Sequence, residues 1–198
     1  NQDGSLNDYL IWIKNDGAKA NTITLKNGTM DAGTTAYSAF ATASSNKQTI
    51  TVNLENINLI NNNSDGAVVK ARGGSVLNVK AGTVITGNDS YVGIEAVGNN
   101  TVVNVYEGAK IYQNGTSSSW GWLLGASGNA TINVLDGEGT SAKGAFGAMT
   151  SGGTINISGG EWIANTDGTI SNDNNGALIA QSSNGAKSII NVTGGTFK

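Results

Sequence analysis

The chain has 198 residues, and glycine (29), asparagine (27), threonine (20) and serine (18) make up 94 of them. Only 13% of the residues are charged, the net charge is -3, and proline, cysteine and histidine are absent. These absences exclude disulfides, thiolate nucleophiles, metals bound by cysteine or histidine, and a Ser-His-Asp triad. We expect no metal and no cofactor. One arginine and ten scattered lysines argue against nucleic-acid binding, and the longest apolar run is too short to span a membrane.

Along the chain, a tripeptide of the form apolar–Asn/Thr–apolar recurs with a mean spacing of about 28 residues. Its seven copies are Ile23-Thr24-Leu25, Ile50-Thr51-Val52, Leu77-Asn78-Val79, Val103-Asn104-Val105, Ile132-Asn133-Val134, Ile155-Asn156-Ile157 and Ile190-Asn191-Val192. Three residues after most copies comes a glycine, and most then show an apolar residue and an Asn-rich turn. The repeated positions of the glycines are Gly28, Gly82, Gly108, Gly137, Gly160 and Gly195.

A third short apolar segment closes each repeat. It includes 9–13, 67–69, 92–94, 122–124, 145–146 and 177–179. Alternation of apolar and polar residues indicates strands, and Gly and Asn suit corners where φ is positive. The sequence therefore predicts an all-β fold: a right-handed parallel β-helix (β-solenoid) of about seven coils, each with about 28 residues and three short strands. One segment, 1–198, is expected, with coils that start near 17, 45, 73, 99, 128, 152 and 184.

Two features of the repeats resemble a known family. They are Gly-Gly-x-apolar, as in Gly159-Gly160-Glu161-Trp162, and the apolar-x-x-Asn that runs from Ile85 to Asn88. They resemble the repeats of autotransporter passenger domains and of polymorphic outer-membrane proteins, which adopt a pectate-lyase-like β-helix. The resemblance implies an exported bacterial protein, extracellular or displayed at the cell surface, that often serves as an adhesin.

The central residues of the tripeptides are expected to form a polar file along one outer face. Stacked asparagines hydrogen-bond from layer to layer, so this file is interpreted as structural. Its predicted members are Thr24, Thr51, Asn78, Asn104, Asn133, Asn156 and Asn191.

Aromatic residues provide the candidate ligand-binding site. Tyr91 and Trp120 both lie twelve residues before a tripeptide, which predicts that they stack on adjacent coils, and Trp122 lies beside them. Such a cluster would bind a sugar or anchor a protein partner; the alternative is that one tryptophan fills a gap in the core. Trp12 and Trp162 are interpreted as core residues. The third segments are apolar at successive positions, which predicts an apolar strip on the outside.

Catalysis is not expected. Asp65 and Asp89, or Glu107 and Asp136, would lie on adjacent coils, but turns attract such residues and two carboxylates are a weak signal for calcium or for hydrolysis. The tetrapeptide 165–168 (Asn-Thr-Asp-Gly) is identical to a polygalacturonase motif, yet the remaining motifs of that family are missing.

Three functions follow, in order of preference. The first is a non-enzymatic adhesin or passenger segment that presents binding surfaces to glycans or proteins of a host or neighbouring cell. The second is an extracellular fibre subunit, in which copies stack end to end through uncapped coils. The third is a polysaccharide lyase or hydrolase. The chain ends in the middle of a coil at Lys198, so we expect a segment of a longer solenoid.

Overall fold

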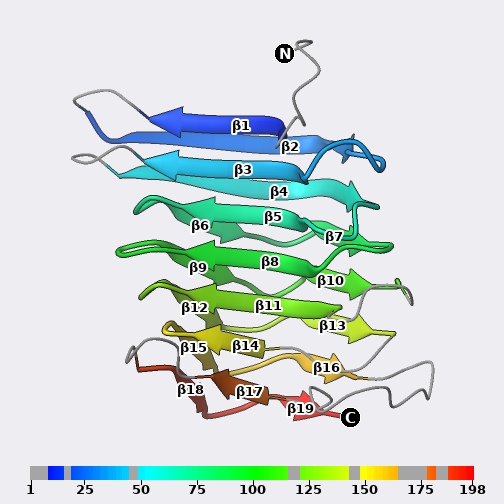
Figure 1. Ribbon diagram of the computed structural model, residues 1–198, viewed down its shortest axis with the longest axis vertical. Helices are drawn as coiled ribbons and strands as arrows, with labels where there is room; N and C mark the ends of the chain where they lie inside the picture. Colours follow the sequence, from blue (N-terminus) through cyan, green and yellow to red (C-terminus); the bar gives the residue numbers. More distant parts are fainter. Residues whose placement is uncertain are drawn as a thin grey trace.

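The computed structural model describes residues 9–15, 19–44, 49–115, 121–142, 148–164, 178–181 and 187–198. These residues form nineteen β-strands and no helix, and all strand pairs are parallel (Figure 1). Strands from successive parts of the chain lie one above another, because the chain returns to the same sheet after each circuit. The described part of the chain is a parallel β-solenoid, as the repeats predict.

A seven-stranded sheet forms one face of the solenoid and lies at the front in Figure 1. Its strands are, in spatial order, β1 (Tyr9–Asn15), β3 (Ser38–Ser44), β5 (Ala67–Arg72), β8 (Val92–Val97), β11 (Trp122–Ser127), β14 (Ala148–Ser151) and β17 (Leu178–Gln181). The expected segments 145–146 and 177 lie outside the described residues. β3 was not predicted from the sequence, because it carries Phe40 as its one large apolar residue.

A twelve-stranded sheet forms the rest of the wall. It contains β2 (Asn21–Asp31), β4 (Ile50–Asn61), β6 (Val76–Val79), β7 (Val84–Gly87), β9 (Val102–Val105), β10 (Lys110–Gln113), β12 (Thr131–Val134), β13 (Glu138–Ser141), β15 (Thr154–Ile157), β16 (Glu161–Ile163), β18 (Ile189–Val192) and β19 (Thr196–Phe197). The long strand β4 pairs with β6 along its first half and with β7 along its second half.

At the start of the chain, the structure does not show the predicted three strands in every coil. β2 and β4 each run unbroken where later parts of the chain have two strands. Leu54 pairs with Val79, whereas Asn58 pairs with Val84, so the later segment has one more residue at this corner. That residue allows a turn at Gly82 (φ 74°), whereas β4 bends only at Asn56 (φ 49°). The number of coils and their handedness stay predictions.

The interior is filled by aligned apolar side chains. One file consists of Val52, Leu77, Val103, Ile132 and Ile155, each 0% exposed and in register with the next. Since a single coil cannot bury its own inward face, each layer depends on its neighbours for stability. Trp162 lies in this core at 1% exposure.

Asparagines form a hydrogen-bonded ladder along the outside. Each side-chain amide donates to the residue one layer before it, at 2.8–2.9 Å from Asn78 onward. The asparagine ladder consists of Asn53, Asn78, Asn104, Asn133, Asn156 and Asn191, and Asn53 donates to Thr24 at 3.3 Å. Asn53 takes the place predicted for Thr51, which instead pairs with Thr22 and Val76 in the neighbouring file. The error arises because β4 alternates without a break, so Ile50-Thr51-Val52 and Val52-Asn53-Leu54 both fit the tripeptide.

The middle of the ladder is expected to contribute measurably to stability. Asn104 donates to Asn78 and accepts from Asn133, both at 2.9 Å. Replacing it by alanine removes two hydrogen bonds, and we expect Asn104→Ala to lower the free energy of unfolding by about 1–3 kcal/mol in urea denaturation. Asn191→Ala removes the bond to Asn156 at an exposed position and should cost less. Equal midpoints for wild type and Asn104→Ala would show that the ladder adds nothing.

Candidate functional site

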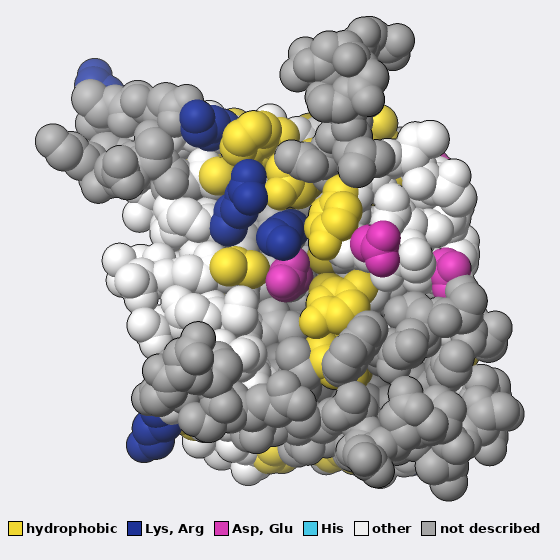
Figure 2. Space-filling model, in the orientation of Figure 1, with side chains coloured by type: hydrophobic (Ala, Val, Ile, Leu, Met, Phe, Trp, Pro, Cys, Tyr) yellow, Lys and Arg dark blue, Asp and Glu magenta, His cyan; other side chains and the backbone are white. Residues whose placement is uncertain are grey.

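Aromatic and charged side chains gather on the outer face of the seven-stranded sheet. Figure 2 shows apolar, basic and acidic side chains together in the middle of this face, beside a flank that is mostly uncharged and polar. The strand register explains the grouping, because equivalent residues of successive strands form files across the sheet. One outward file contains Trp12, Ala41, Lys70, Glu95 and Gly125.

Two tyrosines stand at the edge of this face, where the strands begin. Extension of the strand register, by three residues between β3 and β5 and by one residue between the later strands, places Tyr37, Gly66, Tyr91 and Gly121 in one file. Tyr91 N–H donates to the Gly66 carbonyl at 3.0 Å. Because tyrosine alternates with glycine in this file, Tyr37 and Tyr91 belong to layers about 10 Å apart, and position 66 places no side chain between them. Tyr37 is 38% exposed, and Tyr91 is half-buried.

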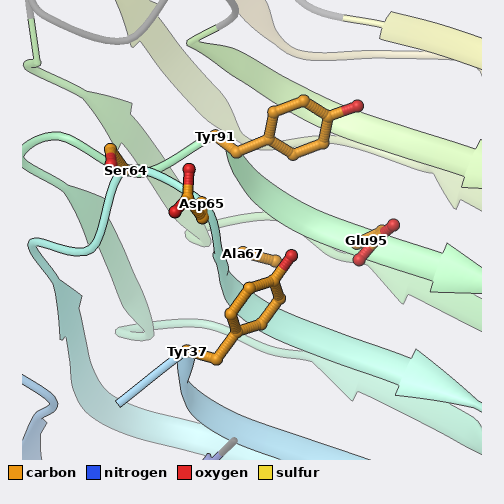
Figure 3. A pocket seen from close by; sticks show the side chains of 6 residues that line it. All are labelled: Tyr37, Ser64, Asp65, Ala67, Tyr91 and Glu95. Carbon is orange, nitrogen blue, oxygen red and sulfur yellow. The ribbon is translucent and has the colours of Figure 1, made fainter. Parts of the chain in front are cut away.

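A pocket of about 420 Å³ occupies this space. Its lining residues are Tyr37, Ser64, Asp65, Ala67, Tyr91 and Glu95. In Figure 3 both tyrosine rings project over the sheet, Asp65 lies between their attachment points, and Glu95 lies on the far side. The backbone beside the pocket requires glycine at position 66, because a Cβ there would fall 1.5 Å from the carbonyl oxygen of Tyr37.

The turn that carries Ser64 and Asp65 is held by side-chain hydrogen bonds. Asn61 Oδ1 accepts from the N–H of Asn63 at 3.1 Å, and Asn63 Oδ1 accepts from the N–H of Asp65 at 2.9 Å. Asn61 is fully buried, and its Nδ2 donates to the carbonyl oxygens of Tyr37 and Ala67, both at 3.0 Å. This one asparagine therefore links the two backbone segments that form the lower side of the pocket.

Charged groups fix the other side of the pocket. Lys70 Nζ lies 2.7 Å from Glu95 Oε2, with both side chains about one-fifth exposed, and 5.8 Å from the centre of the Tyr37 ring. Burial raises the pKa of Tyr91, and the nearby Glu95 and Tyr37 raise it further. The hydroxyl of Tyr91 thus stays protonated at neutral pH and is able to donate a hydrogen bond.

A second pocket of about 220 Å³ shares Tyr91 and Glu95 with the first. It extends across Val92, Trp122, Gly125, Ala126, Ser127 and Ser151. Tyr91 packs edge-on against Trp122, with ring centres 5.4 Å apart. We call the two pockets together the tyrosine groove.

Trp122 forms part of a small apolar cluster outside the main core. It packs with Ala67, Val92 and Tyr91, and it is 1% exposed. This cluster and the exposed Leu10 and Trp12 of β1 are parts of the predicted outer apolar strip that the structure describes. The strip is narrower than expected, since both following residues of β11, Leu123 and Leu124, belong to the main core.

The predicted pairing of Tyr91 with Trp120 does not follow the observed register. Val92 pairs with Trp122, so Gly121 is the counterpart of Tyr91, and Trp120 itself lies outside the described residues. The count failed because the turn after β8 is one residue longer than the turn after β11. Sequence reasoning also missed Tyr37. Counting back from the tripeptide does not identify Tyr37. Aligning the first residues of the strands with one another would have identified it.

Trp12 differs from its predicted core position. Ile11 and Ile13 of β1 point inward, which leaves Trp12 on the outer face at 46% exposure. The guanidinium of Arg72 lies 5.1 Å from the centre of the Tyr9 ring and 5.3 Å from that of Trp12. The intervening strand β3 has alanines at positions 41 and 43, which leave room for this contact.

The carboxylates considered as metal or catalytic pairs give no comparable site. Glu107, Asp136 and Glu138 line a pocket of about 210 Å³, but Lys110 also lines it and lies 2.9 Å from Glu138. Hydrogen bonds from Lys110 and Tyr112 lower the pKa of Glu138. Within the described ranges, no group of three metal-binding side chains occurs. Asp65 lies in the tyrosine groove and Asp89 does not line it; the tetrapeptide 165–168 lies outside the described residues.

Comparisons with protein-family models, with curated proteins and with solved structures found no match to this chain. The described residues contain no helix of sufficient length and apolarity to cross a membrane.

Proposed function

We propose that this chain is a non-enzymatic binding segment of an extracellular or surface-displayed bacterial protein, as the resemblance to passenger-domain repeats implies. In this proposal the solenoid is right-handed, has about seven coils with mostly three strands each, and acts as a rigid support. The tyrosine groove contacts glycans or proteins on a host or neighbouring cell. Stacking into a fibre and cleavage of polysaccharides stay the alternative predictions.

The tyrosine groove is the observation that carries the proposal. Elsewhere on a solenoid rich in Gly, Asn, Thr and Ser, outward positions suit hydrogen bonding between layers. In the groove, by contrast, two tyrosine rings line one pocket together with the polar side chains of Ser64, Asp65 and Glu95. Binding sites typically combine aromatic surface with a few positioned polar groups in this way. Tyr37 and Tyr91 directly precede β3 and β8, so the parallel sheet fixes the backbone that carries them.

Binding to intact cells tests the proposal. Fluorescently labelled protein is incubated with cultured epithelial cells and with bacterial cells, and the double variant Tyr37→Ala/Tyr91→Ala is compared with wild type. We expect binding to fall at least tenfold, because both rings of the groove are lost. Tyr106→Ala, at a half-exposed tyrosine after β9 and outside the groove, is the matched control and should bind as wild type does.

Thermal melting of both variants establishes that they are folded. Unchanged cell binding by the folded double variant, or the absence of binding by wild type to either kind of cell, would overturn the proposed function.

A further inference from the structure

We propose that the ligand of the tyrosine groove is an uncharged glycan, in which hexopyranose rings pack against Tyr37 and Tyr91 and donate hydroxyl hydrogen bonds to Asp65. This inference rests on the proposed function and specifies its ligand.

The two tyrosines provide the apolar part of the site. A pyranose ring has C–H groups on its faces and hydroxyls around its edge, so it suits a flat aromatic ring bordered by hydrogen-bonding groups. Among the described residues that line the first pocket, Ala67 is the one apolar side chain apart from the rings. A mostly polar ligand fits such a lining better than the apolar centre of a protein interface does.

The carboxylates favour hydroxyl donors and disfavour anions. Lys70 is engaged by Glu95 at 2.7 Å. Asp65, by comparison, is exposed and makes no ion pair within the part of the chain that the structure describes. The pocket thus has two carboxylates and one ammonium group at its border. A uronic or sialic acid carboxylate would be repelled there, whereas a sugar hydroxyl finds an ionised acceptor.

The spacing of the rings indicates more than one sugar unit. Tyr37 and Tyr91 belong to the same file, with the layer of Gly66 between them, so the pocket extends along the solenoid axis. The second pocket continues it past Tyr91 toward Ser127. A linear oligosaccharide that lies along this axis contacts both rings, and we expect it to bind more tightly than the monosaccharide.

A printed glycan array with neutral, sialylated and uronic-acid-containing glycans tests the inference, followed by calorimetry with the neutral glycan that is best retained. We expect retention of neutral glycans, and an increase in Kd of at least tenfold for Tyr37→Ala and for Tyr91→Ala. Tyr106→Ala should leave Kd unchanged. Asp65→Asn keeps the shape but removes the charge, so retention of acidic glycans should rise, and Glu107→Gln, outside the groove, should not have this effect.

Three results would overturn the inference. They are acidic glycans retained as well as neutral ones by wild type, neutral binding that survives both tyrosine substitutions, or no retention of any neutral glycan. If the array shows no neutral glycan while cell binding is still lost in Tyr37→Ala/Tyr91→Ala, the groove binds another ligand and the proposed function stands. If cell binding is also absent, both fail.

Discussion

Gly66→Ala is expected to lower the free energy of unfolding by about 3 kcal/mol or more, measured by urea denaturation. A Cβ at this position would overlap the Tyr37 carbonyl oxygen at 1.5 Å and its carbonyl carbon at 2.6 Å. The Tyr37 carbonyl accepts a hydrogen bond from Asn61 Nδ2 at 3.0 Å, so it cannot move away without breaking that bond. The substitution should also disturb the tyrosine groove, because the Tyr37 backbone that it would displace carries one of the two rings.

Gly28→Ala is the matched control for this prediction. Gly28 lies in β2, has no atom within 4 Å of a Cβ added there, and its φ is not positive. Its substitution should change the free energy of unfolding by less than about 0.5 kcal/mol. A Gly66→Ala protein that unfolds at the same urea concentration as wild type would show that β3 and β5 are not packed as described.

Trp162→Ala is expected to cost about 3–5 kcal/mol of unfolding free energy, the usual range for a buried tryptophan. The side chain is 1% exposed, and its Nε1 donates to the Gly159 carbonyl at 3.1 Å. It pairs in register with Gly139, and a Cβ at 139 would lie 2.8 Å from the Trp162 ring. Gly139 therefore leaves room in its own layer for the tryptophan of the next.

This packing predicts that the two positions are energetically coupled. Gly139→Ala alone should destabilise the protein, and it should do so less in the Trp162→Ala background, where one of the crowding groups is gone. Trp12→Ala, at an exposed tryptophan, should cost about 1 kcal/mol or less. Strict additivity of Gly139→Ala and Trp162→Ala would contradict the described contact.

Much of the fold could be predicted because the same types of residue recur at equivalent positions of the repeats. Apolar pairs around Asn78, Asn104, Asn133, Asn156 and Asn191 identify an inward and an outward side of each strand, and the observed ladder joins these residues. The prediction failed where that signal was ambiguous or weak. β4 alternates over two possible registers, and β3 has only one large apolar side chain, so neither Asn53 nor the start of β3 was identified.

The candidate site was harder to predict because it depends on turn lengths. Tyr91 was found, but its neighbours were misplaced, since a difference of one residue in a turn moves the whole preceding strand relative to the next layer. Tyr37 belongs to the site because the register places it two layers from Tyr91, with Gly66 in the layer between them. That position 66 has no room for a Cβ becomes evident only when the layers are stacked.

The measurement that tests the binding surface most directly is NMR of the chain labelled with ¹³C in its five tyrosine rings. The protein is titrated with glycans released from the surface of epithelial cells. The account predicts saturable shifts of the Tyr37 and Tyr91 signals, whereas those of Tyr106 and Tyr112, outside the groove, stay in place. Shifts confined to Tyr106 or Tyr112, or no shift of any tyrosine signal, would contradict it.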